Sequence, residues 1–341
     1  MKTNVWTINQ ATEQNKKRLK EAAEALQQGE LVAFPTETVY GLGADATQET
    51  AVREIFRAKG RPQDNPLIIH VASKAQLYEY VENVPAYVDT LIDVFTPGPL
   101  TFILKDKGLC AKGVTAGLET IAIRIPHHPV ARELIDYTNR PLAAPSANIS
   151  GKPSPTTAQF VEEDLAGRIY GIVDGGQTGI GLESTILDCT TETPTILRPG
   201  GVTGKMIEEA TGLSVQEQKP MNEDSKAHPK APGMKYRHYA PSVPLIIATG
   251  NLEETIKSEQ ATGKRVGVMA RENSLQALDV QPAVTFSLGD TLADVANRMY
   301  YGLRYFNASN CDVIISEAFS EEGIGLAIMN RLKKAATSIQ A

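Results

Sequence analysis

Blocks of apolar residues alternate with amphipathic segments along much of the chain. Residues 31–34 and 67–69 are uninterrupted apolar runs, the pattern of strands that are covered on both faces of a sheet. Residues 49–58 carry apolar side chains at helical spacing, and so do residues 12–28, directly before Gly29. Glycine at that place favours the end of a helix. The blocks predict strands and helices in alternation, as in an α/β domain.

The alternation continues to about residue 212. Further strands are predicted at residues 101–104, 121–125, 142–144, 169–173, 184–187 and 195–197, and further helices at residues 130–137 and 157–165. We therefore predict a first α/β domain over residues 1–212.

Residues 213–242 break the hydrophobic periodicity. They are rich in proline and charge, a composition typical of a linker. The periodicity then returns, with strands predicted at residues 245–248, 265–269 and 312–316 and helices at residues 292–306 and 324–336. This pattern predicts a small Rossmann-like α/β domain over residues 243–341.

The composition is compatible with an ordinary soluble protein of two domains, with 341 residues and a formal net charge of −6. Such a chain lacks the positive coat of a nonspecific nucleic-acid binder, although a local basic crevice remains compatible with it. Cys110, Cys189 and Cys311 lack the spacing of a zinc site or a disulfide framework. No apolar run reaches membrane-spanning length, and the N-terminus lacks a secretory apolar core. We therefore expect a cytoplasmic protein that binds no membrane.

Polar and cationic residues gather where the first two predicted strands end. Residues 35–43 (PTETVYGLG) follow the first strand, and Gly41 and Gly43 permit a tight turn or a close backbone approach to a ligand. Lys59 and Arg61 lie between a predicted helix and the second strand. Since open α/β sheets bind ligands at strand carboxyl ends, we expect these groups to line one crevice. The alternative is that the two cations only complement the helix dipole.

Four short motifs carry a family resemblance: PTETVYGLG, Lys59 with Arg61, Pro66-Leu67, and Ser146-Ala147-Asn148. Together they resemble the YrdC-like family of threonylcarbamoyl-adenylate synthases. The resemblance covers about residues 29–201, and the rest of the chain is similar to the two-domain form of these enzymes. It implies a YrdC-like twisted mixed sheet with helices, joined by the linker to the Rossmann-like domain.

The resemblance implies three substrates: L-threonine, bicarbonate or carbon dioxide, and ATP. The amine of threonine would become a carbamate that attacks the α-phosphate of ATP and expels pyrophosphate. The product, L-threonylcarbamoyladenylate, would serve other proteins that modify transfer RNA. Such a transfer depends on positioning and charge neutralisation rather than on an enzyme nucleophile. The sequence shows no carboxylate cluster with metal-ligand spacing, so we expect Mg²⁺ to arrive with ATP.

Lys59 and Arg61 are the predicted catalytic residues and contacts to the phosphates of ATP. Arginine presents a planar fork and lysine a compact charge to phosphate oxygens, and Asn65 is expected to assist beside them. By resemblance, further ATP contacts are Thr120, Ser146, Ser154 and Arg198. The serines lie in a loop of small polar residues, a type that presents backbone amides to phosphates. The alternatives are an ordinary turn cluster and, for Arg198, a plain exposed arginine.

Arg124 lies in a predicted strand between apolar residues, so its side chain needs an anion. The alternative is a structural ion pair with a glutamate, while the resemblance favours the carboxylate of threonine. The resemblance also assigns Thr38, His70 and Ala144 to threonine, the last through its backbone alone. A lone strand histidine is usually a satisfied core residue, but here we expect His70 to bind substrate rather than to act as a base.

The linker contains a cluster of aromatic and cationic residues, PGMKYRHYAP, at residues 232–241. A simple tether requires none of them. We expect this segment to fold back over the first domain as a lid, with Tyr239 contacting the nucleotide and shielding labile intermediates from water.

Two alternative functions follow from the same motifs. The first is an RNA-binding module without catalysis of its own, but the chain lacks RNP-type aromatic motifs and is basic only near residues 226–237. The second is a carbamoyltransferase of hydrogenase maturation, a class that contains a similar domain. Those proteins also carry zinc-finger cysteine pairs, which this sequence lacks.

Overall fold

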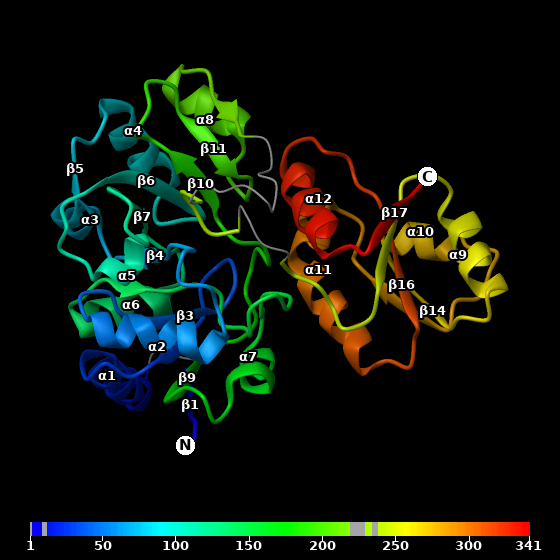
Figure 1. The fold of residues 1–341 in the computed structure, drawn as a ribbon, viewed down its shortest axis with the longest axis horizontal. Helices are drawn as coiled ribbons and strands as arrows, with labels where there is room; N and C mark the ends of the chain where they lie inside the picture. Colours follow the sequence, from blue (N-terminus) through cyan, green and yellow to red (C-terminus); the bar gives the residue numbers. More distant parts are fainter. Residues whose placement is uncertain (1, 9–11, 219–228, 234–237) are drawn as a thin grey trace. The chain divides into compact units, whose positions relative to one another are not determined.

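The computed structural model describes residues 2–8, 12–218, 229–233 and 238–341. The chain divides into two compact units, each with its own sheet (Figure 1). The first unit contains Met1–Ser150, Ser154–Gly179 and Glu183–Tyr236. The second unit contains Gly151–Pro153, Ile180–Leu182 and Arg237–Ala341.

The first unit is built on a mixed sheet. Its strands are β1 (Asn4–Thr7), β2 (Val32–Phe34), β3 (Gly41–Asp45), β4 (Ile68–His70), β5 (Val81–Glu82), β6 (Leu100–Asp106), β7 (Thr120–Arg124), β8 (Leu142–Ala143), β9 (Gly171–Asp174), β10 (Thr185–Asp188), β11 (Thr195–Arg198) and β12 (Gln216–Glu217). Their order is β1-β9-β2-β3-β8-β4-β7-β6-β10-β11-β12, with β5 paired to β6. Strands β4 and β7 run parallel, whereas β6 and β7 run antiparallel, so the sheet is of the mixed type that we expected.

Helices accompany the strands of the first unit, and local sequence signals mark the ends of some of these helices. They are α1 (Glu13–Gln27), α2 (Glu49–Lys59), α3 (Lys74–Tyr80), α4 (Ala86–Phe95), α5 (Lys112–Thr115), α6 (Pro129–Thr138), α7 (Ala158–Leu165) and α8 (Gly204–Thr211). The Thr12 side chain accepts the N–H of Asn15 and caps α1. Gly60 ends α2 in the left-handed conformation, at φ 63°. This cap turns the chain directly after Lys59, towards the start of β4.

The two faces of this sheet are covered differently. Helices α1 and α6 cover one face through a core that includes Leu19, Phe34 and Leu134, and α2, α3, α4 and α7 contribute to the core on the other face. His70 lies on the α1 and α6 side, since its ring meets Phe34. Ile68 shares that side because side chains alternate along a strand. Over β4, β6, β7 and β10, the cover on this side includes Ala231, which packs with Ile68, Ile103, Ala122 and Ile186.

The second unit is a small parallel sheet with helices on both faces. Its strands are β13 (Leu245–Ala248), β14 (Val266–Ala270), β15 (Val284–Ser287), β16 (Val313–Glu317) and β17 (Ser338–Gln340), and its helices are α9 (Leu252–Ala261), α10 (Glu272–Gln276), α11 (Leu292–Tyr305), the short 3₁₀ helix η1 (Phe306–Ala308) and α12 (Ile324–Ala335). The strand order is β15-β14-β16-β13-β17, and all the pairs are parallel. Helices α9 and α10 lie on one side of the sheet, and α11 and α12 on the other (Figure 1). The expected Rossmann-like α/β pattern is confirmed.

Some elements differ from the sequence-based expectations. Gly41 and Gly43 form strand β3 instead of a turn, and a Cβ on Gly43 would lie 2.8 Å from the Phe34 ring, so these glycines serve close packing. Strand β12 and residues 229–233 belong to the first unit although we expected them in the linker. The edge strands β1 and β17 gave no hydrophobic signal, because most of their side chains are exposed. None of the described helices has the length and apolar composition needed to cross a membrane.

Candidate active site

Buried polar side chains meet at the carboxyl ends of β4 and β7. The register pairs His70 with Arg124, and Arg124 with Thr101 of β6. Paired residues of neighbouring strands point to the same face, so these three side chains lie next to one another. Thr38, from the loop after β2, joins them because Arg124 Nη1 donates a hydrogen bond of 3.0 Å to its Oγ1. The sheet register and one hydrogen bond from a loop therefore bring together three of the four residues that the sequence assigned to threonine.

The Arg124 guanidinium is buried and held on several sides. Its Nε donates to the carbonyl of Gly98 at 3.2 Å, and its Nη2 lies 2.7 Å from Oε1 of Glu37. This is the structural ion pair that the sequence analysis kept as the alternative. A contact between Arg124 and the carboxylate of threonine stays a prediction.

His70 is a neutral group in this site. It is buried, its ring meets Phe34 edge to face, and its Nδ1 has no hydrogen-bond partner among the described residues. Burial, and then the positive charge of Arg124, lower the pKa of His70 from 6.5 to about 3. An imidazole with such a pKa is a weak base near neutral pH, which agrees with binding rather than base catalysis.

Lys59 holds the loop that contains Ser146. The residue is 2% exposed, and its Nζ donates to the carbonyls of Ser146 at 2.5 Å and Asn148 at 2.6 Å. A buried ammonium needs such acceptors. The N–H of Ala144 donates to Ile68 at 2.9 Å, so a contact from Ala144 to a ligand would use its carbonyl. The observed role of Lys59 is to fix this loop, and its contact with phosphate stays a prediction.

A second group of predicted ATP contacts lies at the opposite ends of β4 and β7. Arg61 Nη2 donates to the carbonyls of Asn65 and Pro66, at 3.3 and 3.1 Å, just before β4 begins. Asn65 is buried, and its Oδ1 has no hydrogen-bond partner among the described residues. Thr120 opens β7, about 13 Å along the strand from Arg124 at ~3.3 Å per residue. The predicted ATP contacts are therefore not gathered at one point.

Ser154 and Arg198 each contact the short segment before β10. The Ser154 hydroxyl donates to Glu183 Oε1 at 2.5 Å. Arg198 donates through Nε and Nη2 to the carbonyl of Ser184, at 3.1 and 3.0 Å. Arg198 is buried, so it is not the plain exposed arginine of the alternative interpretation.

Ser184 is a site residue to which the sequence analysis gave no role. Its hydroxyl lies 2.8 Å from the Thr101 hydroxyl and accepts from Arg198 Nη2 at 3.2 Å. It thus connects Arg198 with the strand that pairs with Arg124. The available signal was its position as the first residue of the strand predicted at residues 184–187.

Tyr239 belongs to the second unit. It is buried, its φ is 66°, and its ring centroid lies 5.3 Å from that of Tyr300. Residues 234–237 of the predicted lid, and residues 226–228 of the basic stretch, lie outside the described residues. The lid and the contact between Tyr239 and the nucleotide stay predictions.

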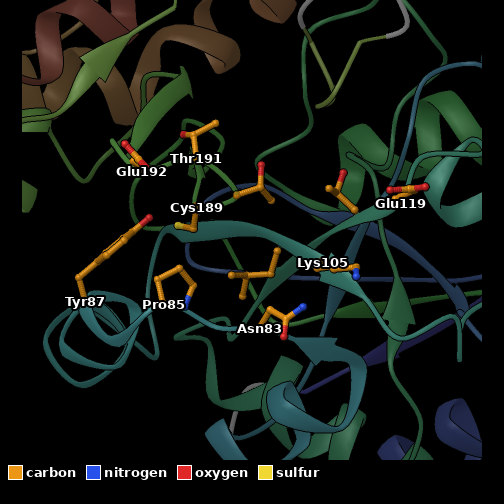
Figure 2. Close-up of a pocket in the computed structure, with 11 residues that line it drawn as sticks. Asn83, Pro85, Tyr87, Lys105, Glu119, Cys189, Thr191 and Glu192 are labelled. Carbon is orange, nitrogen blue, oxygen red and sulfur yellow. The ribbon is translucent and has the colours of Figure 1, made fainter.

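A pocket of about 560 Å³ opens beside Thr120 (Figure 2). Tyr87, Lys105 and Cys189 are among its lining residues. Burial raises the pKa of the Cys189 thiol to about 12, so this thiol is not a reactive nucleophile at neutral pH. Of the predicted site residues, Thr120 is the one that lines this pocket.

The site offers buried charges and hydrogen-bonding groups. Within the described ranges, no group of three or more histidine, cysteine, aspartate or glutamate side chains could hold a metal ion. Its principal groups are the buried cations Arg124, Lys59 and Arg198 and the neutral His70. Such a site can bind and orient a small ligand that carries negative charge.

Fold and site together define an α/β protein in which buried polar groups at the carboxyl ends of β4 and β7 suit a small charged ligand. Residues 24–200 match the family described as telomere recombination (Sua5_yciO_yrdC), and residues 202–337 match the threonylcarbamoyl-AMP synthase C-terminal domain (Sua5_C). The chain belongs to this family, in the form that carries both domains.

Relatives over nearly the full length support the assignment. The chain is 47% identical to the threonylcarbamoyl-AMP synthase of Bacillus subtilis, over 98% of both chains. It is 47% identical to that of Pyrococcus abyssi, over 93% of this chain and 94% of the relative. The crystal structure of P. abyssi Sua5 complexed with L-threonine superposes with a TM-score of 0.91 at 43% identity, covering 99% of this chain and 100% of that one. The resemblance drawn from the sequence motifs is confirmed.

Proposed function

We propose that this protein is an L-threonylcarbamoyladenylate synthase. It joins L-threonine, bicarbonate or carbon dioxide, and ATP to give L-threonylcarbamoyladenylate and pyrophosphate. The observation that carries the proposal is the buried cluster of Arg124, Thr38 and His70 at the carboxyl ends of β4 and β7. The similarity of the chain to P. abyssi Sua5, whose structure was solved with L-threonine, supports it.

The buried cluster suits the amino acid. Arg124 can bind the carboxylate through its guanidinium fork, and Thr38 holds that fork in place through its hydroxyl. The neutral His70 can share a hydrogen bond with the substrate without adding a second positive charge. These groups bind and orient threonine, so that its carbamate faces the nucleotide.

ATP would bind to the groups around Lys59, Ser146 and Arg198. It would also contact Arg61, Asn65 and Thr120 at the other end of the same sheet face. In the reaction, a carbamate oxygen forms a bond to the α-phosphorus of ATP, and the bond from that phosphorus to pyrophosphate breaks. The cations neutralise charge that develops on the phosphate oxygens. The protein supplies position and charge, and no covalent enzyme intermediate is needed.

The remaining assignments follow from this chemistry. Mg²⁺ would arrive with ATP and be held by phosphate oxygens and water, since the described residues provide no dedicated ligand cluster. The adenylate would pass to proteins that modify transfer RNA. A cytoplasmic location suits the free cysteines Cys110, Cys189 and Cys311.

The deciding measurement is pyrophosphate release from ATP and Mg²⁺, with and without L-threonine and bicarbonate. We expect release to require both compounds, and to fall by about 100-fold or more in Arg61→Ala. Arg57→Ala is the matched control, because Arg57 lies only four residues before Arg61 but is exposed and pairs with Glu54. It should keep the wild-type rate.

Absence of threonine-dependent release from folded wild-type protein would contradict the proposal. Labelled RNA that binds equally with and without ATP and threonine would then favour the RNA-binding alternative. Dependence on carbamoyl phosphate would favour the carbamoyltransferase.

A further inference from the structure

Glu37 places a buried carboxylate beside the predicted threonine site. Its side chain is 11% exposed, and that of Arg124 is 4% exposed. The oxygen Oε1 lies 2.7 Å from Arg124 Nη2, yet neither carboxylate oxygen of Glu37 has a hydrogen-bond partner among the described residues. The contact is therefore an ion pair in which the N–H is not directed at the oxygen.

Buried carboxylates normally accept hydrogen bonds from several donors, because burial removes the water that would otherwise supply them. Glu37 thus keeps acceptor capacity that the protein itself does not use. By comparison, the equally buried Glu317 of the second unit accepts from the N–H and Nε of Arg271 and from the hydroxyl of Ser274. The free acceptor sites of Glu37 point to a ligand that donates protons.

We propose that Glu37 binds the α-ammonium group of the amino-acid substrate and accepts its proton, while Arg124 binds the carboxylate. This inference rests on the proposed function. An amino acid carries an ammonium and a carboxylate on the same carbon, and Glu37 and Arg124 present the opposite charges 2.7 Å apart. Binding replaces one buried ion pair with two, so no charge is left uncompensated.

The proton transfer is required by the chemistry of carbamate formation. An ammonium nitrogen has no lone pair, so it must lose a proton before it can attack. Glu37 takes that proton, and the nitrogen lone pair then forms a bond to the carbon of CO₂ while one C=O electron pair moves onto oxygen. The nitrogen loses a second proton to water, which leaves the carbamate anion. When bicarbonate is the source, CO₂ forms from it by loss of hydroxide.

The other titratable groups near Glu37 fit this role less well. Burial and the charge of Arg124 lower the pKa of His70 to about 3, so His70 is a weak base near neutral pH. His128 is partly buried, and burial lowers its pKa although the charge of Glu37 raises it. The Arg124 guanidinium has only N–H donors and cannot accept a proton. Among these groups, the carboxylate of Glu37 is therefore the one best suited to pair with the ammonium group of the substrate.

The test is equilibrium binding of two ligands to the full chain by titration calorimetry. One ligand is L-threonine, and the other is 2,3-dihydroxybutanoate of matching stereochemistry, in which a hydroxyl replaces the amine. Wild-type protein should prefer L-threonine by about tenfold or more. Glu37→Gln should lose that preference to within about twofold, and its pyrophosphate release should fall by about 100-fold.

Two variants separate this role from a structural one. Glu317→Gln removes an equally buried carboxylate from an Arg–Glu pair outside the site, and it should keep the wild-type preference. Glu37→Asp keeps the carboxylate and should recover part of the preference, which also serves if Glu37→Gln does not fold. The inference would be overturned if folded Glu37→Gln kept the wild-type preference and the wild-type rate of pyrophosphate release. It would also be overturned if folded Glu37→Asp recovered none of the preference for L-threonine. Wild-type protein that neither binds threonine nor releases pyrophosphate would instead overturn the proposed function.

Discussion

Single buried side chains set the charge of the candidate site. His70 is neutral, because burial and Arg124 both disfavour its protonated form. Arg124 forms an ion pair with Glu37, and Lys59 donates hydrogen bonds to two backbone carbonyls. The cluster therefore places one uncharged imidazole beside side chains that are held by ionic and polar partners.

The depressed pKa of His70 predicts a pH dependence of stability. The unfolded chain returns this group to an ordinary pKa near 6.5, against about 3 in the folded protein, so between these values the unfolded chain binds a proton that the folded one does not. The stabilisation is fully present above about pH 6.5 and decreases by about 1.4 kcal/mol per pH unit as the pH falls towards 3. Between pH 7 and pH 5, the free energy of unfolding in urea should fall by about 2 kcal/mol more in wild type than in His70→Asn.

Contributions from carboxylates shared by both proteins cancel in that comparison. The same pH dependence in wild type and variant would show that His70 is not held neutral by burial.

At the scale of elements, the turn after β11 decides where Arg198 and Ser184 meet. A Cβ on Gly200 would lie 2.3 Å from the backbone nitrogen of Thr185 and 2.7 Å from the carbonyl carbon of Ser184. These are backbone atoms at the start of β10, which cannot rotate away as a side chain can. The absence of a side chain at Gly200 therefore allows the two strands to close around the site.

We expect Gly200→Ala to lower the free energy of unfolding by about 2 kcal/mol, through overpacking against β10. Because the displaced backbone includes Ser184, ATP affinity should fall as well. Urea unfolding and ATP titration measure the two effects. Gly204→Ala is the matched control, since its Cβ would meet Ile196 Cδ1 at an ordinary 3.5 Å in the first turn of α8, and it should leave both quantities nearly unchanged. Wild-type stability in Gly200→Ala would refute the overpacking argument.

At the scale of the whole molecule, residues 229–233 complete the core of the first unit from far along the chain. Ala231 packs with Ile68, Ile103, Ala122 and Ile186 on the face that also carries Arg124 and His70. Lys230 anchors the segment through an ion pair of 3.0 Å with the buried Asp188. Part of the range that looked like a linker thus covers the sheet between the two groups of predicted ATP contacts.

Ala231→Glu should release this segment, because it would bury a negative charge among apolar side chains and near Asp188. We expect the free energy of unfolding to fall by about 1–3 kcal/mol, and limited proteolysis to cut within residues 229–233 faster than in wild type. Ala86→Glu is the control, because Ala86 is exposed at the first position of α4, where an acidic residue is tolerated. Equal proteolysis of both variants would contradict a packed segment.

Much of the fold could be predicted because hydrophobic periodicity is a local property. Strand β13 and the beginnings of α11 and α12 fall at the predicted residues, and α2 ends one residue after the predicted end. The short edge strands β1 and β17 could not be predicted, because most of their side chains are exposed and give no hydrophobic pattern. Residue type also indicated that Arg124 needs an anion, and the anion found is Glu37.

The sequence by itself determined the alternation of elements, the two domains and the family, since these depend on local pattern and on motifs. Only the tertiary structure decided which groups meet. Lys59 and the Ser146 carbonyl are 87 residues apart, and Arg124 and Thr38 are 86 apart. Such contacts depend on the register of β4, β6 and β7 and on the course of the loops, which no local pattern encodes. The physical reason is that partners of buried charges are fixed by the packing of distant elements.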